Sequence, residues 1–258
     1  MKGKLSVAFY GLIVGICLSN WLLIGVVKNN ALALLMTLAL LFLLLGEIGK
    51  TLTGKASGIL IDSRNRISLS RLQMVGWTVV VLSGVTVAAA YNLSIDAANP
   101  LNFTIPNELL IAMGIAGTSA VASPLVLATT RNPAPLAATT VADGQADPAA
   151  VAAAPTPAPA TPAIATLHAK CSIDEAAWAD LFKGEDAGTA GSVDISKVQQ
   201  FFFTLLLLAV YALSMADAFT SGSRIGSLPA LDQTFLYLLG ISHATYLTYK
   251  AVPKPGPA

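Results

Sequence analysis

The residue best placed for chemistry inside a membrane is His243, which lies in the middle of an apolar run near the end of the chain. An imidazole at this depth needs hydrogen-bonding partners, because hydrocarbon offers none. The candidate partners lie nearby in the chain or on other apolar runs: Ser242, Thr245, Glu47, Thr118 and Ser119. Two interpretations follow, a proton-linked or pore-lining residue and an interhelical hydrogen bond that fixes packing. We favour the hydrogen bond, because His243 is the one ionisable residue this deep in an apolar run.

Glu47 is the second candidate for a functional residue within an apolar run. An intramembrane carboxylate is a functional hypothesis by default. Glu47 lies close to the end of its run, however, and Lys50 follows three residues later. This spacing predicts a local ion pair on one helix face at the membrane edge.

The other residues that could do chemistry form no catalytic or metal-binding pattern. His168 and Cys171 make an isolated His-x-x-Cys, whereas a zinc site takes four protein ligands or three and a water. Cys17 and Cys171 are the only cysteines and give no disulfide framework. The sequence contains no glycine-rich phosphate loop, no nucleophile elbow and no basic-aromatic surface for nucleic acid. We therefore expect no enzyme activity, no cofactor, no metal and no nucleic-acid partner.

Membrane helices must position these residues. Apolar residues make up 55% of the 258 residues and charged residues 11%, with a mean hydropathy of +0.69. A soluble domain carries roughly 25% charged residues, so the composition indicates an all-α integral membrane protein. Six apolar runs are long enough to span a bilayer: about 7–27, 31–49, 71–91, 107–130, 196–215 and 235–249.

The placement of basic residues predicts how these spans are oriented. The net charge is only +1, but nearly all Lys and Arg residues lie on one side of the six runs, and only Lys28 and Arg224 lie on the other. Basic residues collect on the cytoplasmic side of a membrane protein. We therefore expect a plasma (inner) membrane protein with both termini in the cytoplasm.

A heptapeptide pattern occurs twice, at residues 67–73 and 193–199, each time just before an apolar run. Its order is β-branched, small polar, aliphatic, Ser, basic, aliphatic, Gln. At the same offset Thr78 falls on Thr204, and Gly114-Ile115 falls on Gly240-Ile241. This register predicts a parallel internal duplication of a two-helix hairpin.

Within each heptapeptide, Ser-x-x-Gln predicts a capping box that starts a helix. The two predicted boxes are Ser70 with Gln73 and Ser196 with Gln199. A basic residue, Arg71 or Lys197, follows each serine at the positive end of the helix dipole, where it needs another partner. Lipid phosphate is the simplest partner. We favour the interpretation that each heptapeptide is only a well-capped start of a membrane helix, and a shared docking or gating surface is the alternative.

These patterns divide the chain into five segments: a transmembrane hairpin (1–49), a basic cytoplasmic loop with a hairpin (50–130), an Ala/Pro-rich linker (131–166), a short cytoplasmic amphipathic segment (167–192), and a second hairpin with a short tail (193–258). In the basic loop, two apolar stretches around Ser63-Arg64-Asn65 predict a short β-hairpin or turn. In the fourth segment Trp178, Leu181 and Phe182 share one face of a predicted short amphipathic helix, which would rest on the membrane or on a partner.

The function that fits these features is a non-enzymatic multi-pass membrane anchor or scaffold subunit. Its cytoplasmic docking surface would include Trp178, Leu181 and Phe182, and its partners would be the bilayer and either a protein or further copies of itself. The alternative is an oligomeric channel or transporter with His243 in the membrane interior. An intramembrane enzyme comes third.

Overall fold

The computed structural model describes residues 7–95, 98–131 and 167–252. Six α-helices make up most of this described part: α1 (Val7–Asn20), α2 (Asn30–Thr53), α3 (Leu69–Ser94), α4 (Asn107–Arg131), α5 (Ile195–Ala218) and α6 (Gln233–Ala251). A π-helical turn (Trp21–Val26) continues α1. The described residues form isolated β-bridges but no strand, so the all-helical prediction is confirmed.

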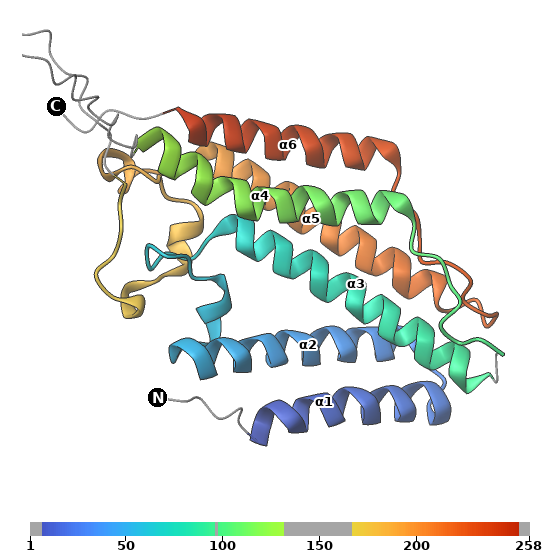
Figure 1. Cartoon of the computed structure of the whole chain (residues 1–258). Coiled ribbons are helices and arrows are strands. Elements are labelled where there is room, and N and C mark those ends of the chain that lie inside the picture. Colours follow the sequence, from blue (N-terminus) through green and yellow to red (C-terminus); the bar gives the residue numbers. More distant parts are fainter. Residues whose placement is uncertain (1–6, 96–97, 132–166, 253–258) are drawn as a thin grey trace, which may run out of the picture.

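Five helical stretches of the described chain are long and apolar enough to cross a membrane: Val7–Val26, Asn30–Thr53, Leu69–Ser94, Asn107–Thr129 and Ile195–Ala218. This is the architecture of a helical membrane protein. The helix α6 is shorter, at 19 residues, and its sequence is more polar. It nevertheless packs along α4 for much of its length (Figure 1). The sixth span therefore stays a prediction.

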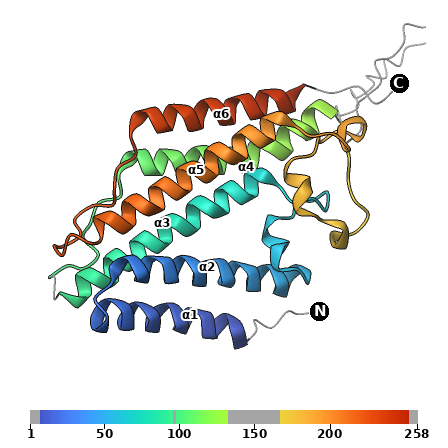
Figure 2. The ribbon, with the colours of Figure 1, turned by 180° about the vertical axis from the view of Figure 1, so that it is seen from behind.

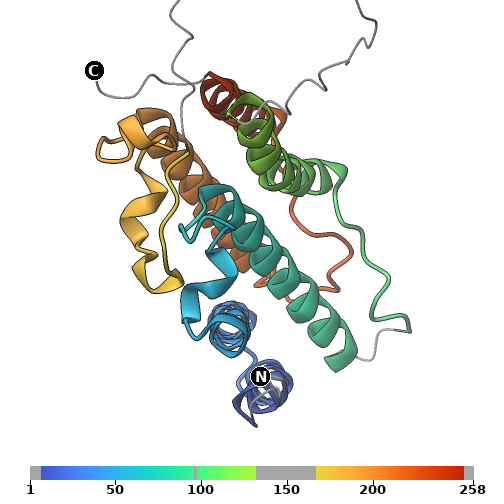
Figure 3. The same cartoon turned by 60° about the vertical axis from the view of Figure 1, so that its left-hand side comes forward.

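Consecutive helices run in opposite directions, so α1, α3 and α5 begin at the end of the bundle where α2, α4 and α6 finish (Figures 1 and 2). We call this end the basic end, because the described basic residues other than Lys28 and Arg224 lie on this side of the bundle. The helix α3 is central and contacts α2, α4 and α5, whereas α1 lies at one edge and packs on α2 (Figure 3). Accordingly 56% of the residues in the most apolar stretch of α3 are buried, against 17% in that of α1 with its π-helical turn.

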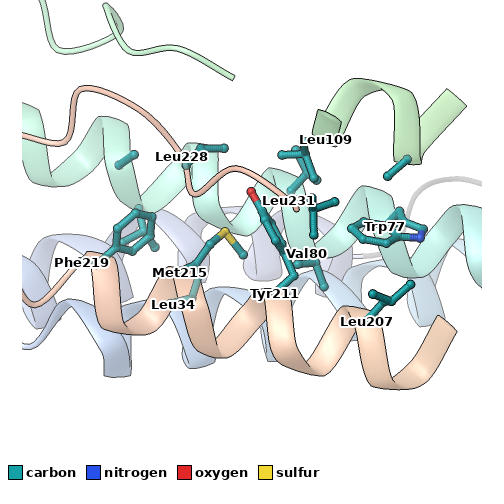
Figure 4. Close-up of a cluster of buried hydrophobic side chains, with 14 of the residues drawn as sticks. Leu34, Trp77, Val80, Leu109, Leu207, Tyr211, Met215, Phe219, Leu228 and Leu231 are labelled. Atoms are coloured by element: carbon teal, nitrogen blue, oxygen red, sulfur yellow. The ribbon is translucent and has the colours of Figure 1, made fainter. Parts of the chain in front are cut away.

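The apolar core is formed mainly by α3 and α5, and side chains from α2, α4 and the loop before α6 complete it (Figure 4). The rings of Trp77 and Tyr211 have centroids 6.1 Å apart, and Met215 is fully buried beside them. Glycine permits this close approach, since a Cβ at Gly76 would lie 2.8 Å from Leu208 Cδ1 and a Cβ at Gly84 would collide with Met215. The two glycines therefore leave room on α3 for the side chains of Leu208 and Met215 from α5.

The two hairpins α3–α4 and α5–α6 share one spacing. Ile195 follows Leu69, and Gln233 follows Asn107, by the same 126 residues (195 − 69 and 233 − 107). Each hairpin is also preceded by a 3₁₀ turn and an antiparallel bridge. The 3₁₀ turns are Ala56–Leu60 and Trp178–Leu181, and the bridges are Ile61 with Ile67 and Lys183 with Val193.

The turn predicted around Ser63-Arg64-Asn65 is confirmed. The Asp62 N–H donates to the Arg66 carbonyl at 2.8 Å, and the Asp62 carboxylate accepts from the Arg64 and Arg66 amides. Asn65 adopts a positive φ of 58°, which asparagine tolerates better than most residues. The turn connects the two sides of the antiparallel bridge between Ile61 and Ile67, and α3 begins two residues later.

Both predicted capping boxes are wrong, because each helix begins one residue before its serine. The N-cap of α3 is Ser68, whose side chain makes no capping hydrogen bond in the described chain. The N-cap of α5 is Asp194, whose carboxylate accepts from the Ser196 and Lys197 amides. Backbone bonds fix these starts: the Ser68 N–H donates to Leu60 O at 2.9 Å, and the Asp194 N–H donates to Phe182 O at 2.7 Å.

The amphipathic helix predicted around Trp178 is also wrong. The chain forms two short 3₁₀ turns there, Ile173–Glu175 and Trp178–Leu181. The Asp180 carboxylate accepts from the Ala177 N–H at 3.0 Å and pairs with Lys170 at 2.7 Å. These bonds within the segment hold a 3₁₀ turn in place of the predicted helix. Most of the predicted Ala/Pro-rich linker, residues 132–166, lies outside the described residues.

Candidate functional site

A buried cluster of charges lies at the basic end of the bundle, centred on Glu185. Its Oε1 lies 2.8 Å from Lys197 Nζ and 3.0 Å from Lys250 Nζ. Its Oε2 lies 2.6 Å from Arg64 Nη1 and 3.7 Å from Arg66 Nη1. Only 7% of Glu185 is exposed. We call these five residues the Glu185 cluster.

The Glu185 cluster joins segments that are far apart in the sequence. Arg64 and Arg66 come from the turn before α3, Lys197 from the first turn of α5 and Lys250 from the last turn of α6. Glu185 belongs to the segment 167–192, which folds over this end of the bundle (Figure 1). One carboxylate therefore ties that segment to both hairpins.

The surrounding cations keep Glu185 ionised. Burial by itself would raise the pKa of Glu185, but the positive charges of Lys250, Lys197 and Arg64 hold that pKa well below its ordinary value. Burial would lower the pKa of Arg64, yet Glu185 and Asp62 raise it. A buried ion pair has to offset a large desolvation cost, so removing one partner is far more harmful than its surface equivalent.

Carbonyl and hydroxyl oxygens stabilise the excess positive charge of the cluster. Arg66 donates to Gly184 O at 2.8 Å, and Lys197 donates to Lys183 O at 2.6 Å. Lys250 donates to Tyr246 Oη at 2.7 Å and to Ser123 Oγ, while Arg64 also pairs with Asp62 at 2.8 Å. Every cation in the cluster thus has oxygen partners in addition to Glu185.

Further contacts hold the segment 167–192 against the loop before α3. Lys55 Nζ donates to Asp174 O at 2.6 Å, and the Asn65 side chain donates to Lys170 O at 2.8 Å. Burial by itself would raise the pKa of Asp180, but hydrogen bonds from Ala177 and Lys170 lower it. The segment is therefore a folded part of the bundle.

Four of the six predicted helix-start residues take part in tertiary contacts. Gln73 donates to Thr204 Oγ1 at 2.7 Å and accepts from Gln200 at 3.2 Å, which links α3 to α5. Ser70 Oγ donates to Tyr246 Oη at 3.4 Å. Arg71 donates to Ile61 O at 2.6 Å, and Lys197 is buried against Glu185. The prediction that Lys197 contacts lipid phosphate is therefore wrong.

The two remaining helix-start residues stay local. Ser196 Oγ donates to the Asp194 carboxylate at 2.5 Å, and Gln199 is exposed on the surface of α5. The buried glutamine of this turn is its neighbour Gln200, which donates to Gln73. The second heptapeptide therefore uses the residue after its final glutamine for the contact between α3 and α5.

His243 is 2% exposed and lies between α4 and α6. Its Nδ1 lies 2.5 Å from Ser119 Oγ, so Ser119 is confirmed among the candidate partners. Its Nε2 makes no hydrogen bond to any described residue.

Glu47 lies half-buried on α2 and lines a surface cavity together with Lys50. The ion pair predicted between these two stays a prediction.

Of the three predicted docking residues, only Trp178 is available to a partner. Trp178 is 59% exposed, whereas Leu181 is 3% exposed and packs in an apolar cluster with Leu60 and Leu69. The ring of Phe182 packs edge-on against Phe201, with centroids 5.1 Å apart. The shared docking face of Trp178, Leu181 and Phe182 is therefore wrong, because two of the three contact the bundle itself.

Sequence reasoning missed the centre of the site. Glu185 stands in a polar stretch without a local motif, and Arg64, Arg66 and Lys250 contributed only to the count of basic residues. Among the described residues no three His, Cys, Asp or Glu side chains gather to hold a metal ion.

Comparison of the chain with protein-family models, curated proteins and solved structures finds no match. The site is therefore interpreted from its own geometry.

Proposed function

We propose that the protein is a non-enzymatic, multi-pass membrane anchor or scaffold subunit that presents residues 167–192 as a fixed platform. The observation that carries this proposal is the Glu185 cluster, which locks the segment to both hairpins through ion pairs of 2.6–3.0 Å to Arg64, Lys197 and Lys250. A docking surface gains affinity when its geometry is set before the partner arrives.

The proposed setting is the plasma (inner) membrane, with six spans and both termini in the cytoplasm. The antiparallel run of α1 to α6 supports this orientation, since α1 starts and α6 finishes at the basic end (Figure 1). Among the described basic residues, Lys28 and Arg224 lie at the opposite end. We place the basic end in the cytoplasm, following the positive-inside rule.

We also infer that α5–α6 is a duplicate of α3–α4. The common spacing of the two helix starts supports this inference, as does the 3₁₀ turn and bridge that precede each hairpin. Both hairpins run in the same direction, which makes the duplication parallel. Inverted repeats, which many secondary transporters contain, run in opposite directions.

The partner would meet the outward side of the platform. Asp174 and Glu175 are exposed there, beside the exposed Cys171 and Trp178. Two exposed carboxylates next to an apolar ring suit a partner that presents basic residues around an apolar contact. The partner is either another protein or a further copy of this chain.

Purification in a mild detergent, followed by native mass spectrometry, tests the proposal. We expect a stoichiometric partner that is lost from the Asp174→Asn, Glu175→Gln double variant. The Asp217→Asn variant is the matched control, because Asp217 is exposed at the opposite end. A protein that carries no partner and conducts ions as a closed homo-oligomer would overturn the scaffold role.

One observation favours the second candidate, a channel or transporter. The Nε2 atom of His243 is buried without a partner among the described residues. A buried ionisable residue in a membrane helix marks proton and ion pathways. Under this alternative, His243→Ala would abolish transport and leave partner binding unchanged, whereas the scaffold proposal predicts no transport to lose.

A further inference from the structure

Two apolar cavities lie side by side at the basic end of the bundle. The first, of about 360 Å³, is formed by α2, α3, α5 and the turn at Trp178. The second, of about 630 Å³, is formed by α2, the start of α3 and the same turn. Phe42, Leu72 and Trp178 line both cavities and form a ridge between them. Both volumes fall in the range of roughly 300–1,000 Å³ that is typical of small-molecule sites.

Both cavities open toward the membrane. Phe42 and Leu205 are each 51% exposed at the first cavity, on helices that are long and apolar enough to span a bilayer. The two polar residues of that cavity, Gln73 and Thr204, are hydrogen-bonded to each other. An occupant of this cavity therefore meets almost only hydrocarbon.

The second cavity also has a charged rim. Lys50 lies in the last turns of α2, is exposed, and lines the cavity on the side of the basic end, and the half-buried Glu47 lines it one turn earlier on α2. Trp178 lies at the same end, and tryptophan is enriched where membrane meets water. The cavities thus have an apolar depth and an amphipathic ridge, and the rim of the second carries an exposed cation, Lys50, outside the half-buried carboxylate of Glu47.

We propose that these cavities bind one phospholipid molecule of the adjacent leaflet. Its two acyl chains lie on the two sides of the ridge of Phe42, Leu72 and Trp178, and its phosphate lies at Lys50. Two adjacent apolar cavities, one of which has an exposed cation at its rim, match a molecule with two chains and one phosphate. This inference does not depend on the scaffold role, because the two share only Trp178: the lipid site rests on Phe42, Leu72 and Lys50, and the scaffold role rests on the Glu185 cluster.

The bound lipid completes the packing of the platform. It fills the space between α2 and α5 and contacts the platform through Trp178. Trp178 is then a lipid contact, and the exposed Asp174 and Glu175 remain for a protein partner. Loss of the lipid would loosen the Trp178–Leu181 turn before it affects the helices.

A neighbouring pair of leucines provides a matched test. Leu205 and Leu206 are 51% and 57% exposed on α5, but of the two only Leu205 lines one of these two cavities. The protein is purified in mild detergent, and its bound phospholipid is measured by native mass spectrometry. We expect about one phospholipid on the wild type, at least a tenfold weaker retention in Leu205→Trp, and a change within twofold in Leu206→Trp.

A charge pair tests the phosphate position in the same way. Lys50→Gln is expected to weaken retention of added dioleoylphosphatidylglycerol three- to tenfold. Lys28→Gln, which removes the same charge at the opposite end, is expected to leave it unchanged. Equal retention in Leu205→Trp and Leu206→Trp would overturn the proposal. So would a dimer that Leu205→Trp dissociates, because a second copy would then fill the cavities.

Fluorescence provides a measurement that needs no cavity-filling variant. A phospholipid with brominated acyl chains is titrated into the detergent-solubilised protein, and tryptophan emission is recorded. We expect quenching that saturates near one lipid per protein and that is largely missing in Trp178→Phe. Quenching that rises without saturation, or that is the same in Trp178→Phe, would show that no lipid binds at this ridge.

Discussion

The two hairpins α3–α4 and α5–α6 start at equivalent positions, but the loops that lead into them differ. In the first, Ser68 bonds back to Leu60, eight residues earlier; in the second, Asp194 bonds back to Phe182, twelve residues earlier. The longer loop carries Glu185, and no equivalent carboxylate is bonded in this way in the shorter one. The first loop instead supplies the cations Arg64 and Arg66.

This difference shows that two hairpins with the same helix spacing can make different side-chain contacts at matched positions. Arg71 and Lys197 are equivalent in the sequence pattern, but Arg71 bonds within its own loop and Lys197 is buried against Glu185. Gly117 and His243 are likewise equivalent, and only His243 makes a bond between helices. The helix starts of the two hairpins share one spacing, and the contacts differ with the residue at each matched position.

The largest expected effect comes from removing the buried carboxylate of Glu185, which lies in the loop before α5. Glu185→Gln leaves the surrounding cations without their carboxylate, and we expect it to lower the free energy of unfolding by roughly 3–5 kcal/mol. Denaturant unfolding in detergent, followed by tryptophan emission, measures this loss. The control Glu175→Gln changes an exposed residue and should cost less than about 0.5 kcal/mol. Similar effects of the two variants would contradict the role of the Glu185 cluster.

The same contribution should depend on pH. The pKa of Glu185 is lowered on folding, so its contribution is fully present above the unfolded pKa of about 4.3 and is lost as pH falls toward the folded pKa. The stability difference between wild type and Glu185→Gln should therefore be constant near pH 7 and shrink below about pH 4.3. Unfolding curves of both proteins at pH 7 and in acid measure it. A difference that is the same at both pH values would argue against an ionised Glu185.

The helix caps give the next largest effect and compare the two hairpins directly. Asp194→Ala removes a carboxylate that accepts from two backbone amides, and we expect a loss of about 1–2 kcal/mol. Ser68→Ala changes the equivalent N-cap, whose side chain makes no capping bond in the described chain, and should be nearly neutral. Thermal unfolding of both variants tests this, and an equal cost would mean that the two starts are capped alike.

The smallest effect is expected at the bond that joins the two hairpins, between Ser119 on α4 and His243 on α6. A double-mutant cycle of Ser119→Ala and His243→Ala should give a coupling of about 0.6 kcal/mol, typical of hydrogen bonds between membrane helices. A cycle of Thr118→Ala with His243→Ala is the control, since Thr118 is exposed, and it should give none. Coupling in both cycles would point to a general change in α4.

The helices were predictable because each depends on its own residues. The expected span 107–130 corresponds to α4 (Asn107–Arg131), and 31–49 corresponds to α2 (Asn30–Thr53). The capping boxes were not predictable, since Ser-x-x-Gln is the same pattern whether the side chains cap a helix or bond to another one. Gln73 bonds to Thr204 on α5, which no local pattern reveals.

The candidate site was predictable only in part. His243 and its partner Ser119 were found because a polar residue in an apolar run draws attention by itself. Glu185 was not found, because a carboxylate in a polar segment is ordinary until its neighbours are known. The predicted docking face failed for a related reason: helical periodicity placed Trp178, Leu181 and Phe182 together, but the chain forms a 3₁₀ turn there, and Leu181 and Phe182 pack against the bundle.

The sequence by itself determined that this chain folds as apolar helices and that its basic residues gather at one end. Insertion of an apolar helix depends on the composition of about 20 consecutive residues, which the sequence displays directly. Only the tertiary structure decided that Glu185 binds Arg64, Lys197 and Lys250, or that Phe42, Leu72 and Trp178 form a ridge. Such contacts require side chains from distant segments to meet within a few ångströms, and chain spacing does not specify those distances.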